Sequence, residues 1–429
     1  NIMYRGNVTC VIFQTHFYIQ RIMPSDQSIM FNKNFIVLKI FGIWSGNIPW
    51  KYYRFYSFIY LFVTFACYNL LLTLNLLYTP RKIELLLREV IFYFTEITVA
   101  TKILTILFMR DKLIDAIKLI DCDEFVGDYE NKAGILYKTN MGYRLGWKLY
   151  TILSNIAYSS QVVVPIFLDM IRGTKAELPI CKYYFLSDEV RESYFLFWFI
   201  YQSVGMYGHM MYNVNIDSLI AGLLVIAIAQ LRLLNHNLRN LKLSQEESKL
   251  PIEIQDKIQM TRLNKLLRHY EVVLNFCETV QNMLSVTLFF QFGVASMIIC
   301  VVMCGLLLPS SSMETRVFLV MYLFTMTLQI FVPGFLGTQL TYESQELVTA
   351  AYNSEWIPRS ESFKRSLKLF RERAAIPIMV SGLQMFPLSL LTFTSIMKTK
   401  GEEKHIIMKL TTSFGKCSGN FRLFLHFIA

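Results

Sequence analysis

Charged and imidazole side chains inside long apolar runs are the residues of this sequence best placed to do chemistry. Glu96 and Lys102 fall within the run 83–109, and His209 falls within a later run that begins near Tyr194. A carboxylate at membrane depth is costly unless it is paired or faces a wet cavity. We therefore expect Glu96 to face the protein interior, with Lys102 either pairing with it or extending toward the membrane surface. Such groups need a polar partner or a water-filled cavity inside the protein.

The sequence lacks the motifs of enzymes and of metal sites. It has no glycine-rich phosphate loop, no HExxH and no recognisable Ser/His/Asp grouping. The eight cysteines include no CxxC pair and no His/Cys cluster with zinc spacing. Cys300 and Cys304 are expected to be reduced, packed thiols, whereas Cys181 lies in a loop and could pair with another exposed cysteine. The sequence predicts no enzyme activity, no metal and no cofactor.

Composition places the chain in the membrane class. Hydrophobic residues make up 54% of it and charged residues 17%, below the quarter typical of soluble domains. The apolar runs are continuous rather than alternating, which indicates membrane-spanning helices rather than a barrel. The net charge of +11 is explained by basic loops and anionic lipid, so no nucleic-acid partner is expected. The predicted fold class is all-α, a polytopic membrane protein with seven transmembrane helices.

Seven apolar runs and the polar segments between them divide the chain. The runs begin at about residues 55, 83, 145, 194, 275, 317 and 376. The predicted organisation is a cytoplasmic N-terminal segment (1–54, in which 1–30 is doubtful), transmembrane helices one to four (55–229), cytoplasmic anchor helices (230–274), transmembrane helices five and six (275–340), a second cytoplasmic anchor segment (341–375), the start of transmembrane helix seven (376–397) and an atypical tail (398–429). The absence of an internal repeat argues against an inverted-repeat transporter.

The distribution of Lys and Arg predicts the orientation. The segments 1–54, 110–146, 232–270 and 341–375 carry most of the basic residues that lie between spans, so the positive-inside rule places the N-terminus in the cytoplasm. Seven spans then place the C-terminus outside, the reverse of a G-protein-coupled receptor. The sequon at Asn7 should therefore stay unmodified.

Several stretches resemble the insect odorant receptors over about Phe31 to Met397. They are FNKNFIVLKIFGIW, DSLIAGLLVIAIAQLRLL, LLRHYEVVLNFCETVQNMLS, GTQLTYESQELVTAAYNSEW and KRSLKLFRERAAIPIMVSGLQMFPLSLLTFTSIMK. The gustatory branch instead ends in a TYxxxxxQF pattern that this sequence lacks. The resemblance implies an odorant-specific tuning subunit that forms a ligand-gated cation channel with a co-receptor subunit as a hetero-tetramer. It also implies a plasma-membrane location in the dendrite of a sensory neuron.

The resemblance further implies a pocket for a small hydrophobic odorant in the outer half of spans two, three, four and six. Aromatic side chains, Met and a few polar groups suit such a ligand, although aromatic residues at helical spacing also serve as packing or as an interface belt. The ligand-binding candidates at this depth are Phe92, Tyr93, Glu96, Tyr158, Gln161, Tyr201, Met206, His209, Tyr322 and Thr325. Glu96→Gln is expected to alter ligand response without blocking assembly.

In the family, inner helix extensions hold four subunits together, and the end of span seven lines the pore. The polar stretch 230–274 and the basic amphipathic segment 362–373 fit such an anchor, the alternative being a lone helix on the inner leaflet. The anchor candidates are His236, His269, Ser344, Tyr352, Trp356 and Arg371, and the pore-helix start is placed at Leu390, Phe393 and Ile396.

Charged residues arrive early in the seventh run. Lys398, Lys400, Glu402, Glu403 and Lys404 follow Met397 directly, and several charges together at the end of a pore helix are expensive. A non-conducting or mis-spliced receptor variant therefore stays open as an alternative, with a gustatory-type receptor or a secondary transporter behind it.

Overall fold

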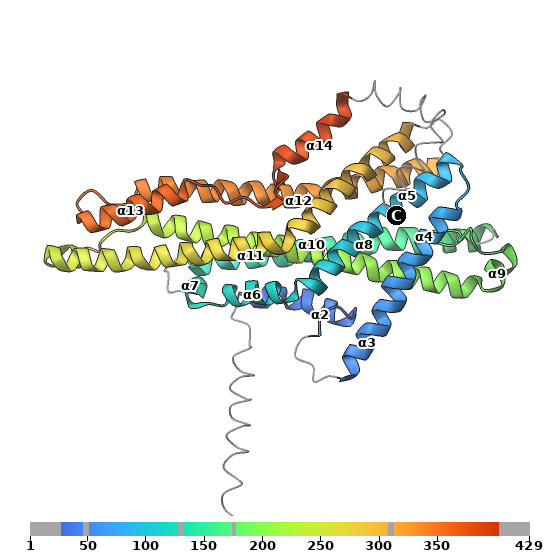
Figure 1. Ribbon diagram of the computed structural model, residues 1–429, viewed down its shortest axis with the longest axis horizontal. Coiled ribbons are helices and arrows are strands. Elements are labelled where there is room, and N and C mark those ends of the chain that lie inside the picture. Colours follow the sequence, from blue (N-terminus) through green and yellow to red (C-terminus); the bar gives the residue numbers. More distant parts are fainter. Residues whose placement is uncertain (1–26, 46–50, 127–131, 174–176, 308–312, 403–429) are drawn as a thin grey trace, which may run out of the picture.

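Helices make up most of the computed structural model, which describes residues 27–45, 51–126, 132–173, 177–307 and 313–402 (Figure 1). A helix pairs its backbone donors and acceptors within one segment, as an apolar environment requires. In chain order the helices are η1 (Ser28–Phe31), α2 (Asn32–Ile40), α3 (Lys51–Leu61), η2 (Phe62–Cys67), α4 (Tyr68–Tyr78), α5 (Ile83–Phe108), α6 (Arg110–Ile120), α7 (Asp123–Val126), α8 (Lys132–Arg172), α9 (Asp188–Ser193), α10 (Phe195–Arg239), η3 (Glu247–Lys249), α11 (Ile252–Leu307), α12 (Met313–Tyr352), α13 (Glu361–Ala374) and α14 (Leu390–Glu402). A short antiparallel pair, β1 (Ser381–Gly382) and β2 (Phe386–Pro387), precedes α14.

Five helical stretches in the described part of the chain are long and apolar enough to cross a membrane. The first is formed by α3, η2 and α4, which follow one another without a break, η2 being a π-helical turn. The five stretches are Tyr52–Tyr78, Leu85–Phe108, Phe195–Arg239, Ile252–Leu307 and Arg316–Tyr352. The stretches in α10, α11 and α12 are much longer than the roughly 20 residues that a bilayer needs. These three helices must therefore continue outside the membrane.

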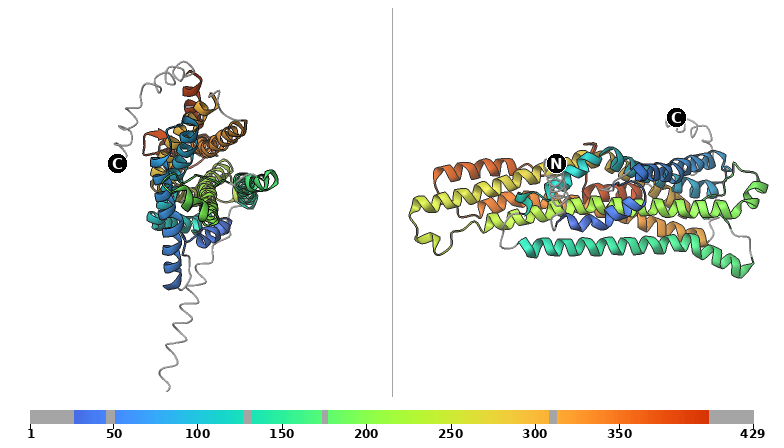
Figure 2. Two further views of the ribbon diagram at one scale, coloured as in Figure 1. Left: turned by 90° about the vertical axis from the view of Figure 1, so that its right-hand side faces the viewer. Right: turned by 90° about the horizontal axis from the view of Figure 1, so that it is seen from below.

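Helix α10 forms the centre of the bundle. In its most apolar window 83% of the residues are buried, against 17% for the first stretch. Helices α2, α5, α8, α11 and α12 all pack against it, and Figure 2 shows α8 lying along one side of the elongated body. Side chains that meet around α10 are therefore the ones shielded from both water and lipid.

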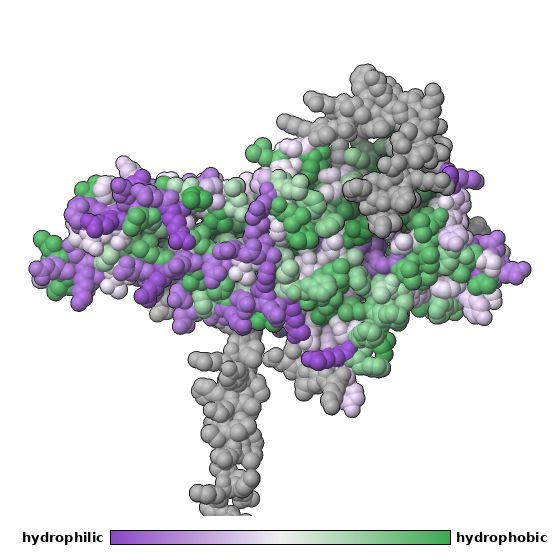
Figure 3. Space-filling view, in the orientation of Figure 1, coloured by the Kyte–Doolittle hydropathy of each residue, from purple (hydrophilic) through white to green (hydrophobic). Residues whose placement is uncertain are grey.

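The molecule divides along its length into a polar end and an apolar end. In Figure 3 hydrophilic side chains gather over α13 and the neighbouring part of α11, and hydrophobic ones gather over α4 and α5. Apolar side chains such as Phe55, Phe58 and Phe62 are exposed at the apolar end, where lipid can cover them. The single helix α11 runs through both ends (Figure 1).

The helix bounds fall close to the predicted apolar runs in spans two and four, whereas α12 contains the sixth run and continues beyond residue 340 to Tyr352. Helix α8 is longer than the run predicted from about residue 145. It begins at Lys132 and continues past Pro165 to Arg172. The segment between spans two and three contains two helices, α6 and α7, that the sequence reasoning missed. Leu113, Ala116 and Ile120 are buried along one face of α6, at the spacing of an amphipathic helix.

The seventh helix does not begin at Ile376 as predicted, but at Leu390. Pro377 disfavours a helical conformation at the residue before it, and the chain then makes the β1–β2 turn. Ser389 begins the helix instead, since its Oγ accepts a hydrogen bond from the Thr392 backbone N–H at 3.2 Å, as an N-cap does. The Leu390 N–H also bonds Thr338 Oγ1 on α12 at 2.9 Å.

The segment 376–389 lies directly against α12. A Cβ added to Gly337 would fall 2.1 Å from the backbone oxygen of Leu388, so only glycine permits this approach. Farther back, the Ile378 N–H bonds Ser344 Oγ at 3.0 Å. On the other side α11 holds β1, where Gln281 bonds Ser381 and Ser285 bonds the Leu383 N–H. The path of the chain into α14 is therefore set by α11 and α12 rather than by helical propensity of the segment itself.

Candidate ligand-binding site

Glu96 on α5 and His209 on α10 are paired between the two helices, through Oε2 and Nδ1. The other imidazole nitrogen, Nε2, lies 2.7 Å from the Thr64 backbone oxygen in η2. A carbonyl oxygen only accepts hydrogen bonds, so Nε2 carries a hydrogen. One further proton must then lie between Nδ1 and Oε2, whichever atom holds it. The pair as a whole is therefore neutral, which makes its burial far less costly than that of a lone carboxylate.

Aromatic rings surround the Glu96–His209 pair. The Tyr68 ring lies 4.6 Å from the His209 ring, between centroids, and Phe65 and Tyr212 lie at 6.3 and 6.0 Å. Gly205 makes the closest of these contacts possible, because a Cβ there would fall 2.5 Å from the Tyr68 ring.

A second group of rings lies one turn from Glu96 toward the start of α5. Phe92 is 6.4 Å from Tyr322 and 6.0 Å from Phe318, both on α12. Thr95 Oγ1 donates to the Ile91 backbone oxygen at 2.9 Å and also bonds the Tyr322 hydroxyl. The Glu96–His209 pair thus lies among α4, α5, α10 and α12. Its surroundings are apolar with few polar groups, the composition that is typical of ligand sites.

The predicted pairing of Glu96 with Lys102 is wrong. Six residues turn a helix by about 600°, which places the two side chains roughly 120° apart around α5. Lys102 instead binds Asp217 Oδ1 at 2.5 Å and Asn213 Oδ1 at 2.6 Å on α10. Its side chain is fully buried, so it does not extend to the membrane surface either.

Asp217 also joins α8 and α12 to this contact. The Tyr150 hydroxyl and the Gln329 amide each donate to Asp217 Oδ2 at 3.3 Å. Gln329 bonds Asn213 as well, at 3.2 Å. A narrow gap lined by Thr95 and Asn213, among others, lies between this cluster and the aromatic site. The two polar sites are therefore neighbours along the same α5–α10 contact.

The structure brings together some of the predicted ligand residues and separates others. Phe92, Glu96, His209 and Tyr322 meet, and Tyr201 on α10 reaches across to the first span, where its hydroxyl bonds the Val63 backbone oxygen at 2.9 Å. Half-buried Met206 packs against the buried cluster that contains Tyr68. The remaining candidates have no described contact to this centre: Tyr158, which packs on Tyr207 and bonds the Ser203 oxygen, half-buried Tyr93 and Gln161, and exposed Thr325.

Sequence reasoning missed the contribution of the first span. Thr64, Phe65 and Tyr68 all touch His209, yet no candidate was taken from that helix. Thr64 and Tyr68 are four residues apart and share a face, which was an available signal. The contact between Gly205 and Tyr68 left no such signal, because it joins distant parts of the sequence.

The loop before α9 closes the site on the side of Tyr68. Leu178, Ile180, Cys181 and Tyr183 form one buried cluster with Tyr68. Gln202 on α10 holds this loop, donating to the Cys181 backbone oxygen at 2.8 Å. Cys181 is a free, buried thiol, which corrects the expectation that it is exposed and open to pairing.

The predicted anchor residues lie at the polar end. His269 Nε2 is 2.9 Å from Gln230 Oε1, buried between α11 and α10, and the Arg371 guanidinium lies 5.8 Å from the Tyr352 ring, joining α13 to α12. Trp356 donates to the Tyr352 oxygen at 3.2 Å, and His236 contacts Asn240 at 2.9 Å. These contacts are all within one chain, so the role of these residues between subunits stays a prediction.

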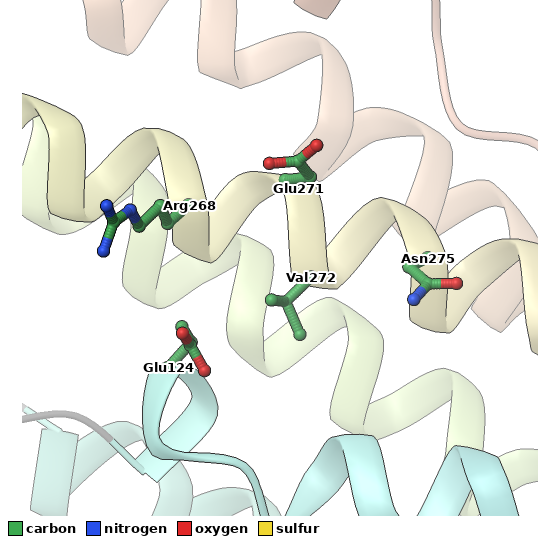
Figure 4. Close-up of a pocket in the computed structure, with 5 residues that line it drawn as sticks. All are labelled: Glu124, Arg268, Glu271, Val272 and Asn275. Atoms are coloured by element: carbon green, nitrogen blue, oxygen red, sulfur yellow. The ribbon is translucent and has the colours of Figure 1, made fainter.

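An open hollow of about 530 Å³ lies between α7 and α11 at this polar end. Figure 4 shows Glu124 from α7 and Arg268 on the same side of it, with Glu271, Val272 and Asn275 farther along α11. Three of its five lining residues are charged, which does not suit a small apolar ligand.

The sequence model of the 7tm Odorant receptor family matches residues 82–401, about three quarters of the chain. The chain belongs to the odorant receptor family. It is 26% identical to Odorant receptor 67c of Drosophila melanogaster over 201 residues, 47% of this chain and 48% of that protein. It is 25% identical to Odorant receptor 43b of the same fly over 132 residues, 31% of this chain and 32% of that one. The matched part thus spans half or less of these relatives.

A solved structure shares the fold. The insect olfactory receptor OR5 from Machilis hrabei in complex with eugenol superposes with a TM-score of 0.75 at 18% identity, covering 90% of this chain and 98% of that one. A second structure of the same receptor gives a TM-score of 0.73 at 19% identity, covering 88% of this chain and 96% of that one. The all-helical, seven-transmembrane fold predicted from the sequence is confirmed. The inner and outer assignment of each segment stays a prediction.

Proposed function

We propose that this odorant receptor family member binds small, volatile, apolar ligands beside the Glu96–His209 pair and gates a non-selective cation channel together with a co-receptor subunit. The observation that carries this proposal is a neutral, buried acid–imidazole pair, with rings of the first span and α10 against the imidazole and the Phe92 and Tyr322 rings of α5 and α12 about one turn away. Family membership over residues 82–401 supports a receptor rather than an enzyme.

The long inner extensions of α10, α11 and α12 support assembly into a hetero-tetramer. Arg232 and Arg239 on α10 pair with Glu343 and Glu346 on α12 at 2.7 and 2.6 Å, so the extensions form one body with α13 folded against them. In this proposal that body is the cytoplasmic anchor, the N-terminus is inside, and the protein lies in the plasma membrane of a sensory dendrite. The sequon at Asn7 lies outside the described residues, and we expect it to carry no glycan in cells.

The charges at the end of α14 favour a second candidate, a receptor variant that does not conduct. The helix that begins at Leu390 reaches Glu402, and its last turns contain Lys398, Lys400 and Glu402. If these turns line the pore, the subunit conducts only through its partners or not at all.

Co-expression with a co-receptor subunit and recording of ligand-evoked cation current tests both candidates. The chain should be compared with a variant in which the sequence after Met397 is replaced by an apolar, aromatic segment like that of the family. Current from both forms supports the channel, and current from the replaced form alone supports the non-conducting variant. No current from either form, with both at the cell surface, contradicts the channel function. Sequencing the transcript across the Lys398 codon shows directly whether the ending is used.

A further inference from the structure

Glu96 uses only one of its two carboxylate oxygens within the described part of the chain. Oε2 contacts His209, and Oε1 has no hydrogen-bond partner there. The Glu96 side chain keeps 13% of its surface exposed, whereas His209 keeps 2%. One carboxylate oxygen at the aromatic site is therefore accessible to a small molecule.

This oxygen is an acceptor in both possible protonation states of the pair. If the shared proton is on His209, Glu96 is a carboxylate and Oε1 accepts. If the proton is on Oε2, Oε1 is the carbonyl oxygen of the acid and also accepts. The conclusion does not depend on where the proton lies.

The polar hydrogens of Glu96, His209, Thr95 and Tyr322 already take part in hydrogen bonds within the protein. Both hydrogens available to the pair are directed to the Thr64 oxygen and between Nδ1 and Oε2. Thr95 gives its one hydroxyl hydrogen to the Ile91 oxygen, so the Tyr322 hydroxyl must donate to Thr95. Tyr68 is 1% exposed and sealed beneath the loop before α9. Within the described residues, the donors of Glu96, His209, Thr95 and Tyr322 are thus all used, and Glu96 Oε1 remains as an acceptor.

We propose, on the basis of the function proposed above, that the site selects neutral ligands with an O–H donor on an apolar body, that is, alcohols or phenols. Such a ligand donates its hydroxyl hydrogen to Glu96 Oε1 while its apolar part packs against the rings of Phe92 and Tyr322. Ethers, esters and ketones of the same shape carry no hydrogen to donate to Oε1 and lose this hydrogen bond. A protonated amine adds an uncompensated charge to a pair that is neutral, which a buried site disfavours.

A matched ligand series tests this selectivity on the full-length protein. The probes are 2-phenylethanol, its methyl ether and 2-phenylethylamine, which differ only in the terminal group. One readout is ligand-evoked current from the receptor co-expressed with a co-receptor. The other is the rise in the melting temperature of the purified receptor in lipid nanodiscs, which requires binding but no conduction.

We expect the alcohol to act at concentrations roughly five- to tenfold lower than the ether in both readouts, the ratio that one hydrogen bond supplies. Glu96→Met removes the acceptor and should bring this ratio to about one. Glu96→Gln should keep most of it, because the amide can donate to His209 Nδ1 and still present an oxygen. This differs from the expectation from sequence alone, in which Glu96→Gln alters the ligand response.

Glu89→Gln is the matched control on the same helix. Glu89 is also buried, but its Oε2 accepts from Asn75 at 2.7 Å away from the aromatic site, and glutamine can accept the same bond. It should leave the alcohol-to-ether ratio unchanged.

The results separate this inference from the proposed function. Alcohol-selective stabilisation without current contradicts the channel function and supports the selectivity, whereas equal currents from alcohol and ether support the channel and overturn the selectivity. An ether or amine as effective as the alcohol in the wild type overturns the inference even if Glu96→Met does not fold. Retained alcohol preference in a folded Glu96→Met protein, or no response to the alcohol in either readout, also overturns it.

Discussion

Removing one partner of the Lys102–Asp217 pair should destabilise the bundle far more than removing both. Lys102 is fully buried and has two contacts, Asp217 Oδ1 at 2.5 Å and Asn213 Oδ1 at 2.6 Å. Asp217 keeps 14% exposure and has two further donors, Tyr150 and Gln329, each at 3.3 Å. The pair therefore joins α5 to α10 and, through Asp217, to α8 and α12.

The magnitude differs between the two single substitutions. Breaking a buried ion pair costs about 3–5 kcal/mol, because the remaining charge stays buried without its partner. Lys102→Met leaves Asp217 with two donors and some exposure, so we expect the lower end, about 3 kcal/mol. Asp217→Leu leaves the ammonium with one amide oxygen and no route to solvent, so we expect the upper end, about 5 kcal/mol. The double substitution leaves no charge and should cost less than either single one.

The assay is thermal unfolding of the purified wild type, both single variants and the double variant in the same lipid nanodiscs. The coupling between the two substitutions, rather than either melting temperature alone, reports the pair. Lys118→Met is the control, because the Lys118–Asp115 pair is largely exposed and such pairs contribute little. Additive single effects, or a double variant less stable than both singles, would refute the assignment of Lys102 and Asp217 as a buried, mutually dependent pair.

Three further outcomes are expected from other contacts. Gly205→Ala should lower stability by about 1–3 kcal/mol through overpacking against Tyr68, measured as a fall in melting temperature, whereas Gly142→Ala, with no neighbour within 4 Å of the added Cβ, should not. Ser344→Ala leaves the Ile378 N–H without its acceptor and should cost about 1–3 kcal/mol, seen as faster proteolysis of segment 376–389; unchanged cleavage would contradict that role. The Ser244 backbone N–H and the Arg262 guanidinium hold the pKa of Glu247 below its usual value. The ionised Glu247 carboxylate therefore stabilises this loop fully above the usual carboxyl pKa, and the stabilisation is lost as the pH falls through the lowered pKa of Glu247. Hydrogen exchange of residues 242–250, corrected for intrinsic rates, should therefore rise on acidification in the wild type and lose that dependence in Glu247→Gln.

Much of the helical framework could be predicted because its cause is local. The apolar runs 83–109 and from Tyr194 onward carry their own signal, and the helices α5 and α10 follow them closely. The prediction of a helix from Ile376 was wrong because the cause of the structure there is not local. The composition of this segment is apolar, but Pro377 and the contacts with α12 and α11, such as those of Ser344 and Gln281, determine its conformation. Those contacts join residues far apart in sequence.

The candidate site was predictable in its residue types and not in its pairings. Glu96 was identifiable because a carboxylate inside an apolar run is energetically costly unless it has a partner. Its partner could have been Lys102 or His209 on charge alone, and the six-residue spacing along one helix was the available argument against Lys102. The part played by Tyr68 depends on how the first span crosses α10 at Gly205, which no local pattern encodes.

Helix α11 restricts how the lengths of related chains can vary. Its 56 residues extend without interruption for about 84 Å, from the polar end to the apolar end of the molecule. Deleting one residue near its middle would turn the two halves by about 100° relative to each other. Leu263 and His269 in one half and Phe292 and Val302 in the other are all buried and could not keep their contacts together. In related sequences, insertions and deletions should therefore be found in the loop around Glu247 and be rare within residues 252–307.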